Sequence, residues 1–227
     1  MNNMDIHNYK GRFERTLVRL DEDKEISVGN REIIHKFKDN CLCRNISYGK
    51  LDAYLFYLMK FTKMLDKPIG DASKEDIMRV MADLNQTDYS EETKVCFKIV
   101  IRKVYQMVRG FEGKEYPDEV KWITTTISQN HRKLPEELLT EEEVQNIIRA
   151  GQNTRDKALL SCLAESGCRI SEIGTLQIKH VSFEEYGARL TVKGKTGTRK
   201  ILIINSTPYL QEWINHRRWG NLYSCYG

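Results

Sequence analysis

The feature of this sequence that most constrains its fold is a change of hydrophobic period along the chain. Through most of residues 31–176, apolar residues recur three and four positions apart, as on the buried face of an amphipathic helix. Further on, residues 188–192 and 200–204 are rich in β-branched side chains and are separated by a glycine-containing turn. We therefore expect a mainly α protein whose later part contains a small antiparallel sheet.

The composition sets the broad class of the protein. The chain has 227 residues, of which 40% are hydrophobic and 30% are charged, and it contains four prolines. These values are typical of a soluble globular protein, and the length suits two modest domains. No apolar run is long enough to span a membrane, and residues 1–15 lack the apolar core of a secretion signal. We expect the protein to stay in the cytoplasm.

Cysteines and histidines give no sign of a metal site. No cysteines form a C-x-x-C pair, and no histidines lie four residues apart, which is the local spacing that helical metal sites use. We expect no metal and no other cofactor. We interpret the cysteines as buried free thiols, with Cys96 and Cys162 among helical core positions.

The first half of the chain predicts a helical domain. Residues 1–30 lack a sustained apolar period, so we interpret them as a weakly ordered or short-helical extension. Residues 31–113 predict three or four amphipathic helices, the last two capped by Ser73 and Ser90, and Gly110 closes the last one. Residues 114–136 show little periodicity and predict a linker.

A second domain is expected over residues 137–227. Thr140 and Glu143 form a capping box that opens one helix, and a second helix over residues 155–166 ends at Gly167. A short helix around residues 171–176 precedes the β-hairpin. A last helix is expected from Ser206 onwards, with an apolar face that includes Tyr209, Leu210 and Trp213.

Positive charge is unevenly distributed, although the net charge is only +4. Five basic residues and no acid lie within residues 93–109, and four basic residues and no acid lie within residues 192–200. On the helix that begins at Ser90, one stripe combines Lys94, Lys98, Arg102, Tyr105 and Arg109. Such a stripe is either a solvated helix face or a surface that contacts phosphates.

Two sequence motifs resemble a known family. Residues 166–173, Ser-Gly-Cys-Arg-Ile-Ser-Glu-Ile, followed by Leu176, are similar to the T-G-x-R-x-x-E-L box of tyrosine recombinases, the phage integrase family. Residues 192–199, Val-Lys-Gly-Lys-Thr-Gly-Thr-Arg, resemble the G-K-x-x-K-x-R hairpin of the same family. The resemblance covers roughly residues 31–218. It implies a SAM-like helical core-binding domain, followed by the N-terminal part of an α+β catalytic domain.

The resemblance also implies roles for individual residues. Arg169 would be a catalytic arginine, and Glu172 would support it. Lys195 would be the catalytic lysine, with Lys193 and Lys200 as alternatives because the hairpin register is open. The alternatives without a catalytic role are a surface Arg169 paired with Glu172 or Glu165, and a solvated lysine in a turn.

The family's tyrosine nucleophile is not found in its expected context. No H-x-x-R box occurs in the sequence, so we expect this box and the nucleophile to lie beyond Gly227. Tyr223 and Tyr226 are disfavoured as nucleophiles because no such box precedes them. The chain alone is therefore expected to bind DNA without cleaving it, whereas a longer parent protein would recombine DNA through a phosphotyrosine.

The expected partner is double-stranded DNA, held in a clamp between the two domains. DNA-binding residues would be Lys94, Lys98, Arg102, Tyr105, Arg109 and Arg199, and the parent would assemble as a tetramer on paired sites. Two alternatives stay open, a truncated non-catalytic DNA-binding protein and a helical DNA-binding regulator. The sequence leaves open the DNA site, and whether the parent is an integrase or a multimer resolvase.

Overall fold

The computed structural model describes residues 7–126, 138–194 and 197–219. Its contacts divide the chain into two compact units, His7–His131 and a second unit that holds Arg132–Gly227. We call their described parts the N-terminal unit (residues 7–126) and the C-terminal unit (residues 138–194 and 197–219). Among the described residues, no helix is both long and apolar enough to cross a membrane.

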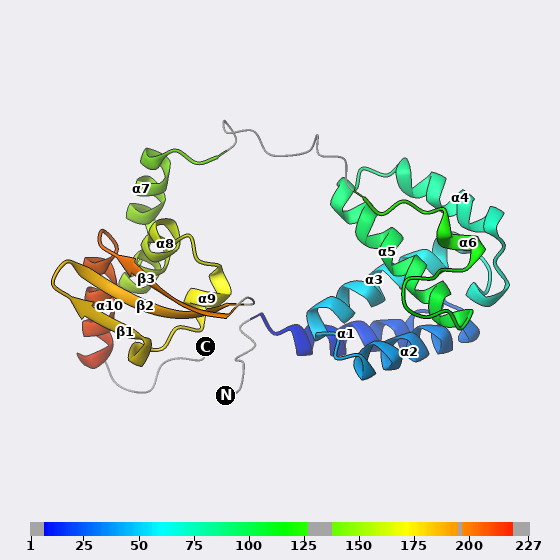
Figure 1. Cartoon of the computed structure of the whole chain (residues 1–227), viewed down its shortest axis with the longest axis horizontal. Helices are drawn as coiled ribbons and strands as arrows, with labels where there is room; N and C mark the ends of the chain where they lie inside the picture. The colour runs from blue at the N-terminus through cyan, green and yellow to red at the C-terminus, as the bar shows by residue number, and fades with distance from the viewer. Residues whose placement is uncertain (1–6, 127–137, 195–196, 220–227) are drawn as a thin grey trace. The chain divides into compact units, whose positions relative to one another are not determined.

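The N-terminal unit is built from helices around one hydrophobic core (Figure 1). Its longer helices are α1 (Tyr9–Glu22), α2 (Val28–Cys43), α3 (Tyr48–Leu65), α4 (Lys74–Asn85) and α5 (Glu91–Val108). A short 3-10 turn, η1 (Ile69–Asp71), precedes α4, and a short helix, α6 (Asp118–Lys121), follows α5. Leu51, Leu55, Leu58 and Phe61 on α3 are fully buried, so α3 supplies much of the core.

Helix ends in this unit lie where the capping residues predict them. Ser73 accepts a hydrogen bond from the backbone of Asp76, whose carboxylate accepts one from Ser73 N in return, which completes a capping box. Ser90 Oγ caps α5 by accepting a hydrogen bond from Thr93 N. Gly110 follows α5 with φ of 71°, a conformation that glycine adopts without a steric penalty.

The beginning of the chain differs from the expected weakly ordered extension. Residues 9–22 form the full helix α1, which buries Phe13 and Leu20 in the core of the N-terminal unit. Asp52 on α3 anchors it, because Thr16 Oγ1 donates to Asp52 Oδ1 at 2.7 Å and Arg12 pairs with Asp52 at 3.1 Å. Helix α2 begins at Val28, inside the segment that was expected to be an extension.

The linker was predicted at residues 114–136, but the first part of this segment belongs to the N-terminal unit. Residues 118–121 form α6, and Val120 and Ile123 are buried in the core of the N-terminal unit. The segment lacks a helical period because it contributes just a few side chains to the core. Residues 127–137 lie outside the described residues.

The C-terminal unit packs helices against a small sheet (Figure 1). It contains α7 (Glu141–Ala150), α8 (Thr154–Ser166), α9 (Ile170–Gly174), the 3-10 turn η4 (Ile178–His180) and α10 (Thr207–Trp219). Strands β1 (Val181–Glu184), β2 (Gly187–Gly194) and β3 (Gly197–Ile203) form an antiparallel sheet in the order β1-β2-β3. The hairpin β2–β3 is confirmed, while β1 is a strand that the sequence pattern did not predict.

The core of this unit lies between one face of the sheet and α8 and α10. Ala188, Leu190 and Val192 alternate along β2 and point into this core, where they meet Cys162 of α8 and Leu210 of α10. The capping box of Thr140 and Glu143 and the end of α8 at Gly167, with φ of 60°, are as predicted.

The thiols are partly as expected. Cys41, Cys162 and Cys168 are buried and free, but Cys43 and Cys96 are exposed. Cys96 was expected at a core position and lies instead on the solvent side of α5, one residue before the buried Phe97. Cys225 lies outside the described residues.

Candidate functional site

Arg169 lies in the short connection between α8 and α9. Gly167 ends α8 in a left-handed conformation, Cys168 turns into the core, and Arg169 is the N-cap residue of α9. The side chain of Arg169 is 65% exposed. This local geometry presents a guanidinium group at the surface from the connection between two helices.

Glu172 holds Arg169 from the protein side. The Glu172 side chain is 2% exposed, and its carboxylate accepts from Arg169 N at 3.0 Å and from Arg169 Nη1 at 3.2 Å. The pairing of Arg169 with Glu172, which we left open as a simple ion pair, is therefore present. It leaves most of the guanidinium free to meet an anion from solvent.

Glu165, the other possible partner of Arg169, serves a different purpose. Its carboxylate accepts hydrogen bonds from the backbone nitrogens of Ile204, Asn205 and Ser206 at 2.7–3.0 Å, and from Ser206 Oγ. It therefore ties the end of α8 to the start of α10. Arg169 is left with Glu172 as its partner.

Arg199 of β3 reaches the same carboxylate from the sheet. Arg199 Nη1 donates to Glu172 Oε1 at 3.0 Å, and Nη2 donates to Glu172 Oε2 at 2.8 Å. Hydrogen bonding from Arg199, followed by that from the Arg169 backbone, lowers the pKa of Glu172 to about 2. We had predicted Arg199 to bind DNA, but the structure commits much of its guanidinium to Glu172.

The two alternatives to Lys195 face away from this cluster. Val192 pairs with Arg199 across the hairpin, and Lys193 pairs with Thr198. Since side chains alternate along a strand, Lys193 and Lys200 lie on the sheet face opposite to Arg199, and both are exposed. Lys195 lies outside the described residues, so its role stays a prediction, as does the exclusion of Tyr223 and Tyr226, which lie there too.

The basic stripe predicted on α5 is largely engaged within the chain. Lys94 is buried and pairs with Glu91 at 3.1 Å, while Arg109 pairs with Glu119 at 3.0 Å. Arg102 lies 3.9 Å from the centroid of the Tyr116 ring. Lys98 is half-buried. These side chains offer less positive charge to a partner than the sequence pattern suggested.

Tyr105 does not belong to an exposed stripe. It is fully buried and packs edge-on against Phe61 in the core of the N-terminal unit. The buried face of α5 includes Val100 and Tyr105 together with Phe97, Ile101 and Val104. The prediction that Tyr105 lies on an exposed face that contacts DNA is therefore wrong.

A different basic surface emerges from three helices, and we call it the basic cluster (Arg44, Lys50 and Lys103). Arg44 follows α2, Lys50 lies in the first turn of α3, and Lys103 lies on α5. All three influence the thiol of Cys41. Burial raises the pKa of this thiol, and the positive charges of Lys103, Arg44 and Lys50 oppose the rise. Arg44 and Lys103 also line one hollow together with Tyr54 and Gln106, and no acid is among the described residues that line it.

The basic cluster was missed because its members come from three helices and Lys103 is far in the sequence from Arg44 and Lys50. No ion pair with an acid forms at Arg44, Lys50 or Lys103 within the part of the chain that the structure describes. Lys50 Nζ instead lies 5.7 Å from the centroid of the Tyr54 ring. No periodicity within one helix could have shown this convergence.

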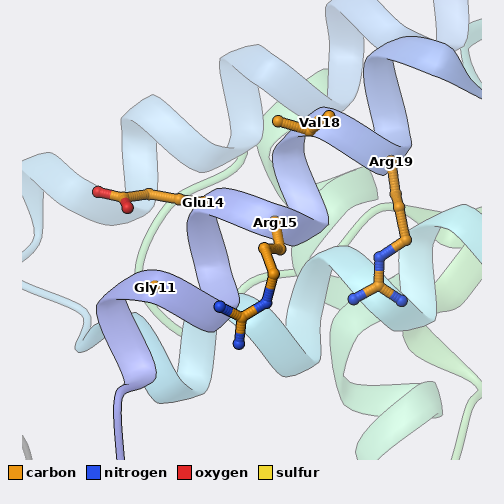
Figure 2. A pocket seen from close by; sticks show the side chains of 5 residues that line it. All are labelled: Gly11, Glu14, Arg15, Val18 and Arg19. Carbon is orange, nitrogen blue, oxygen red and sulfur yellow. The ribbon is translucent and has the colours of Figure 1, made fainter.

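Figure 2 shows a second hollow, along the exposed side of α1. Its lining residues, Gly11, Glu14, Arg15, Val18 and Arg19, lie three or four positions apart on this single helix. Arg15 and Arg19 extend to the same side, but no buried polar group lies among them. The hollow is therefore an exposed face of a single helix.

Comparison with known proteins identifies relatives that match most of the chain. Residues 137–224 match the phage integrase family. Tyrosine recombinase XerA of Pyrococcus horikoshii is 29% identical over 184 residues, which are 79% of this chain and 58% of that protein. XerA of Pyrococcus furiosus is 27% identical over 82% of this chain and 61% of that protein.

The fold also matches solved structures. The XerH site-specific recombinase bound to difH substrate, in its pre-cleavage complex, superposes with a TM-score of 0.59 at 16% identity. The match covers 95% of this chain and 69% of that one. This chain spans about three-fifths of the length of the curated relatives that it matches. Residues 137–224 are thus similar in sequence to the phage integrase family of tyrosine recombinases, and the mainly helical fold with a three-stranded sheet is similar to that of the XerH recombinase.

Proposed function

We propose that this chain binds double-stranded DNA, and that it contributes Arg169 to a phosphodiester-cleaving site of a site-specific recombinase. The observation that carries the proposal is the Arg169 guanidinium, which is largely exposed while a buried carboxylate holds it from behind. A guanidinium presents paired donors that fit two non-bridging phosphate oxygens, and it stays charged at all relevant pH values.

The relatives support the chemical class of the partner. XerH, whose fold this chain shares, is described in complexes with its difH substrate before and after cleavage. In the reaction that we propose, a tyrosine of the complete site attacks the phosphodiester, and Arg169 stabilises the charge that develops on the phosphate oxygens. Lys195 would protonate the leaving 5′-oxygen. Self-association on paired DNA sites belongs to the same proposal.

By itself, the 227-residue chain is proposed to bind DNA without cutting it. The sequence contains no H-x-x-R box, and the family uses that box to complete the set of groups around the phosphate. An assay of strand cleavage on a nicked duplex tests this point directly. A covalent complex between this chain and DNA would show that the chain cleaves.

In the N-terminal unit, we propose that the basic cluster contacts phosphates. Its three cations come from different helices, all influence Cys41, and have no acidic partner among the described residues. Two of them, Arg44 and Lys103, line a hollow whose described lining residues include no acid. Phosphate contacts release condensed counterions, so each one steepens the loss of affinity with salt by about 0.9 in a double-logarithmic plot.

The proposal is tested by fluorescence anisotropy with a duplex across a salt series. Arg44→Ala with Lys103→Ala should weaken binding and reduce the salt slope by about two, since two contacts are lost. The matched control is Arg15→Ala with Arg19→Ala, which removes the same charge from the exposed side of α1 (Figure 2). If both double variants have equal effects, net charge rather than the basic cluster explains the binding.

A further inference from the structure

One carboxylate is shared by two arginines from different elements of the C-terminal unit. Glu172 accepts from Arg169 on the N-terminal side of α9 and from both Nη atoms of Arg199 on β3. Each of its oxygens accepts from both arginines, with distances of 2.8–3.2 Å. The Glu172 side chain is 2% exposed, so solvent hardly competes for these bonds.

The same carboxylate also fills the space beside the end of β2. A Cβ atom at Gly194 would collide with Glu172 Oε1 and would lie 3.3 Å from Arg199 Nη1. The side chains of Glu172 and Arg199 therefore occupy the space that a side chain at position 194 would need. Gly194 pairs with Gly197 of β3, and this is the last pair that the structure describes in the β2–β3 hairpin.

The geometry points to Arg199 as a positioning residue of the proposed site. Through Glu172 it sets the direction of the Arg169 guanidinium. This inference rests on the proposed function of Arg169. It differs from the DNA-contact role that the sequence suggested, because Arg199 acts through Glu172 and not on the DNA.

A bidentate contact explains why arginine, and not lysine, occupies position 199. The planar guanidinium of Arg199 reaches both oxygens of Glu172, whereas an ammonium group is a point charge without this paired geometry. Arg199 Nη2 also donates to Cys168 Sγ at 3.7 Å, next to Arg169 in the sequence. Arg199 therefore contacts Cys168, which precedes Arg169, and Glu172, which follows it.

The test uses the whole chain with ¹⁵N-labelled arginine. Nuclear magnetic resonance of the Arg169 Nε–Hε group reports the motion of its side chain, and titration with inorganic phosphate reports its affinity for the anion. Arg199→Lys keeps the positive charge beside Glu172, Gly194→Ala disturbs Glu172 from the other strand, and Lys200→Met is the control on the opposite sheet face. Backbone spectra and thermal melting show whether each variant keeps its fold.

We expect Arg199→Lys and Gly194→Ala to increase the motion of the Arg169 side chain and to weaken phosphate binding about tenfold, which corresponds to one charge-assisted hydrogen bond. Lys200→Met should change neither. Unchanged Arg169 motion in Arg199→Lys would overturn the inference, and so would an equal effect of Lys200→Met. If phosphate does not bind to Arg169 in the wild type, the proposed function fails, while the Arg169 motion still decides the role of Arg199.

Discussion

Glu172 illustrates at the scale of one residue how a buried acid can support an exposed cation. Its carboxylate is nearly inaccessible and carries hydrogen bonds from Arg199 and Arg169, which hold its pKa at about 2. An unfolded chain would titrate this group near its ordinary pKa of 4.5. Since the folded pKa is depressed, the stabilisation is present above about pH 4.5 and is lost as the pH falls towards 2.

We expect Glu172→Gln to lower the melting temperature of the C-terminal unit at neutral pH, because the amide cannot balance two guanidinium groups. The difference from the wild type should shrink as the pH falls from about 4.5 towards 2, where Glu172 itself becomes protonated. Calorimetry at a series of pH values measures this, with the exposed Glu185→Gln as a control. A difference that stays constant over that range would contradict the assigned ionisation.

At the scale of elements, α1 shows why a polar sequence can still form part of a core. Leu20 is fully buried, and Phe13 is 5% exposed, although most other positions of the helix face solvent. We expect Leu20→Ala to destabilise the N-terminal unit by about 2–5 kcal/mol, the usual cost of a large-to-small change in a core. Urea unfolding followed by circular dichroism measures the loss.

Val18 offers a control on the same helix. It is 54% exposed, so Val18→Ala should change the free energy of unfolding by no more than about 0.5 kcal/mol. If Leu20→Ala were as mild as Val18→Ala, α1 would contribute little to the core, and it would behave like the weakly ordered or short-helical extension that the sequence pattern predicted.

The elements that the sequence predicted are those fixed by short-range interactions. The capping boxes at Ser73 and Thr140 join residues three positions apart, and so does the contact between Arg169 and Glu172. The missed features depend on long-range contacts. Thr16 meets Asp52 across 36 positions, and Arg199 meets Glu172 across 27. Local periodicity and motifs carry no information about such pairs.

The misplaced stripe on α5 has a related cause. Helical spacing correctly placed Lys94 and Tyr105 on one line, but it could not show which neighbouring helices cover that line. Core packing buries Tyr105, and a partner on the same helix holds Lys94. The basic cluster, by contrast, forms where α2, α3 and α5 meet. Its charges therefore come together only when the N-terminal unit folds.

At the scale of the whole molecule, two separate cores should give the chain two unfolding transitions. The buried residues form one cluster in the N-terminal unit and another in the C-terminal unit. A domain with its own core can unfold as its own cooperative unit. We expect differential scanning calorimetry to resolve two transitions, or one broad transition that fits two components.

Matched core variants assign these transitions. Leu58 and Leu190 are both fully buried, the first in the N-terminal unit and the second in the C-terminal unit. Leu58→Ala should lower one transition temperature and leave the other in place, while Leu190→Ala should do the reverse, because each cavity costs about 2–5 kcal/mol in its own core alone. If either variant shifted a single common transition, the two cores would be coupled, and the sites of the two units could no longer be treated as independently folded parts.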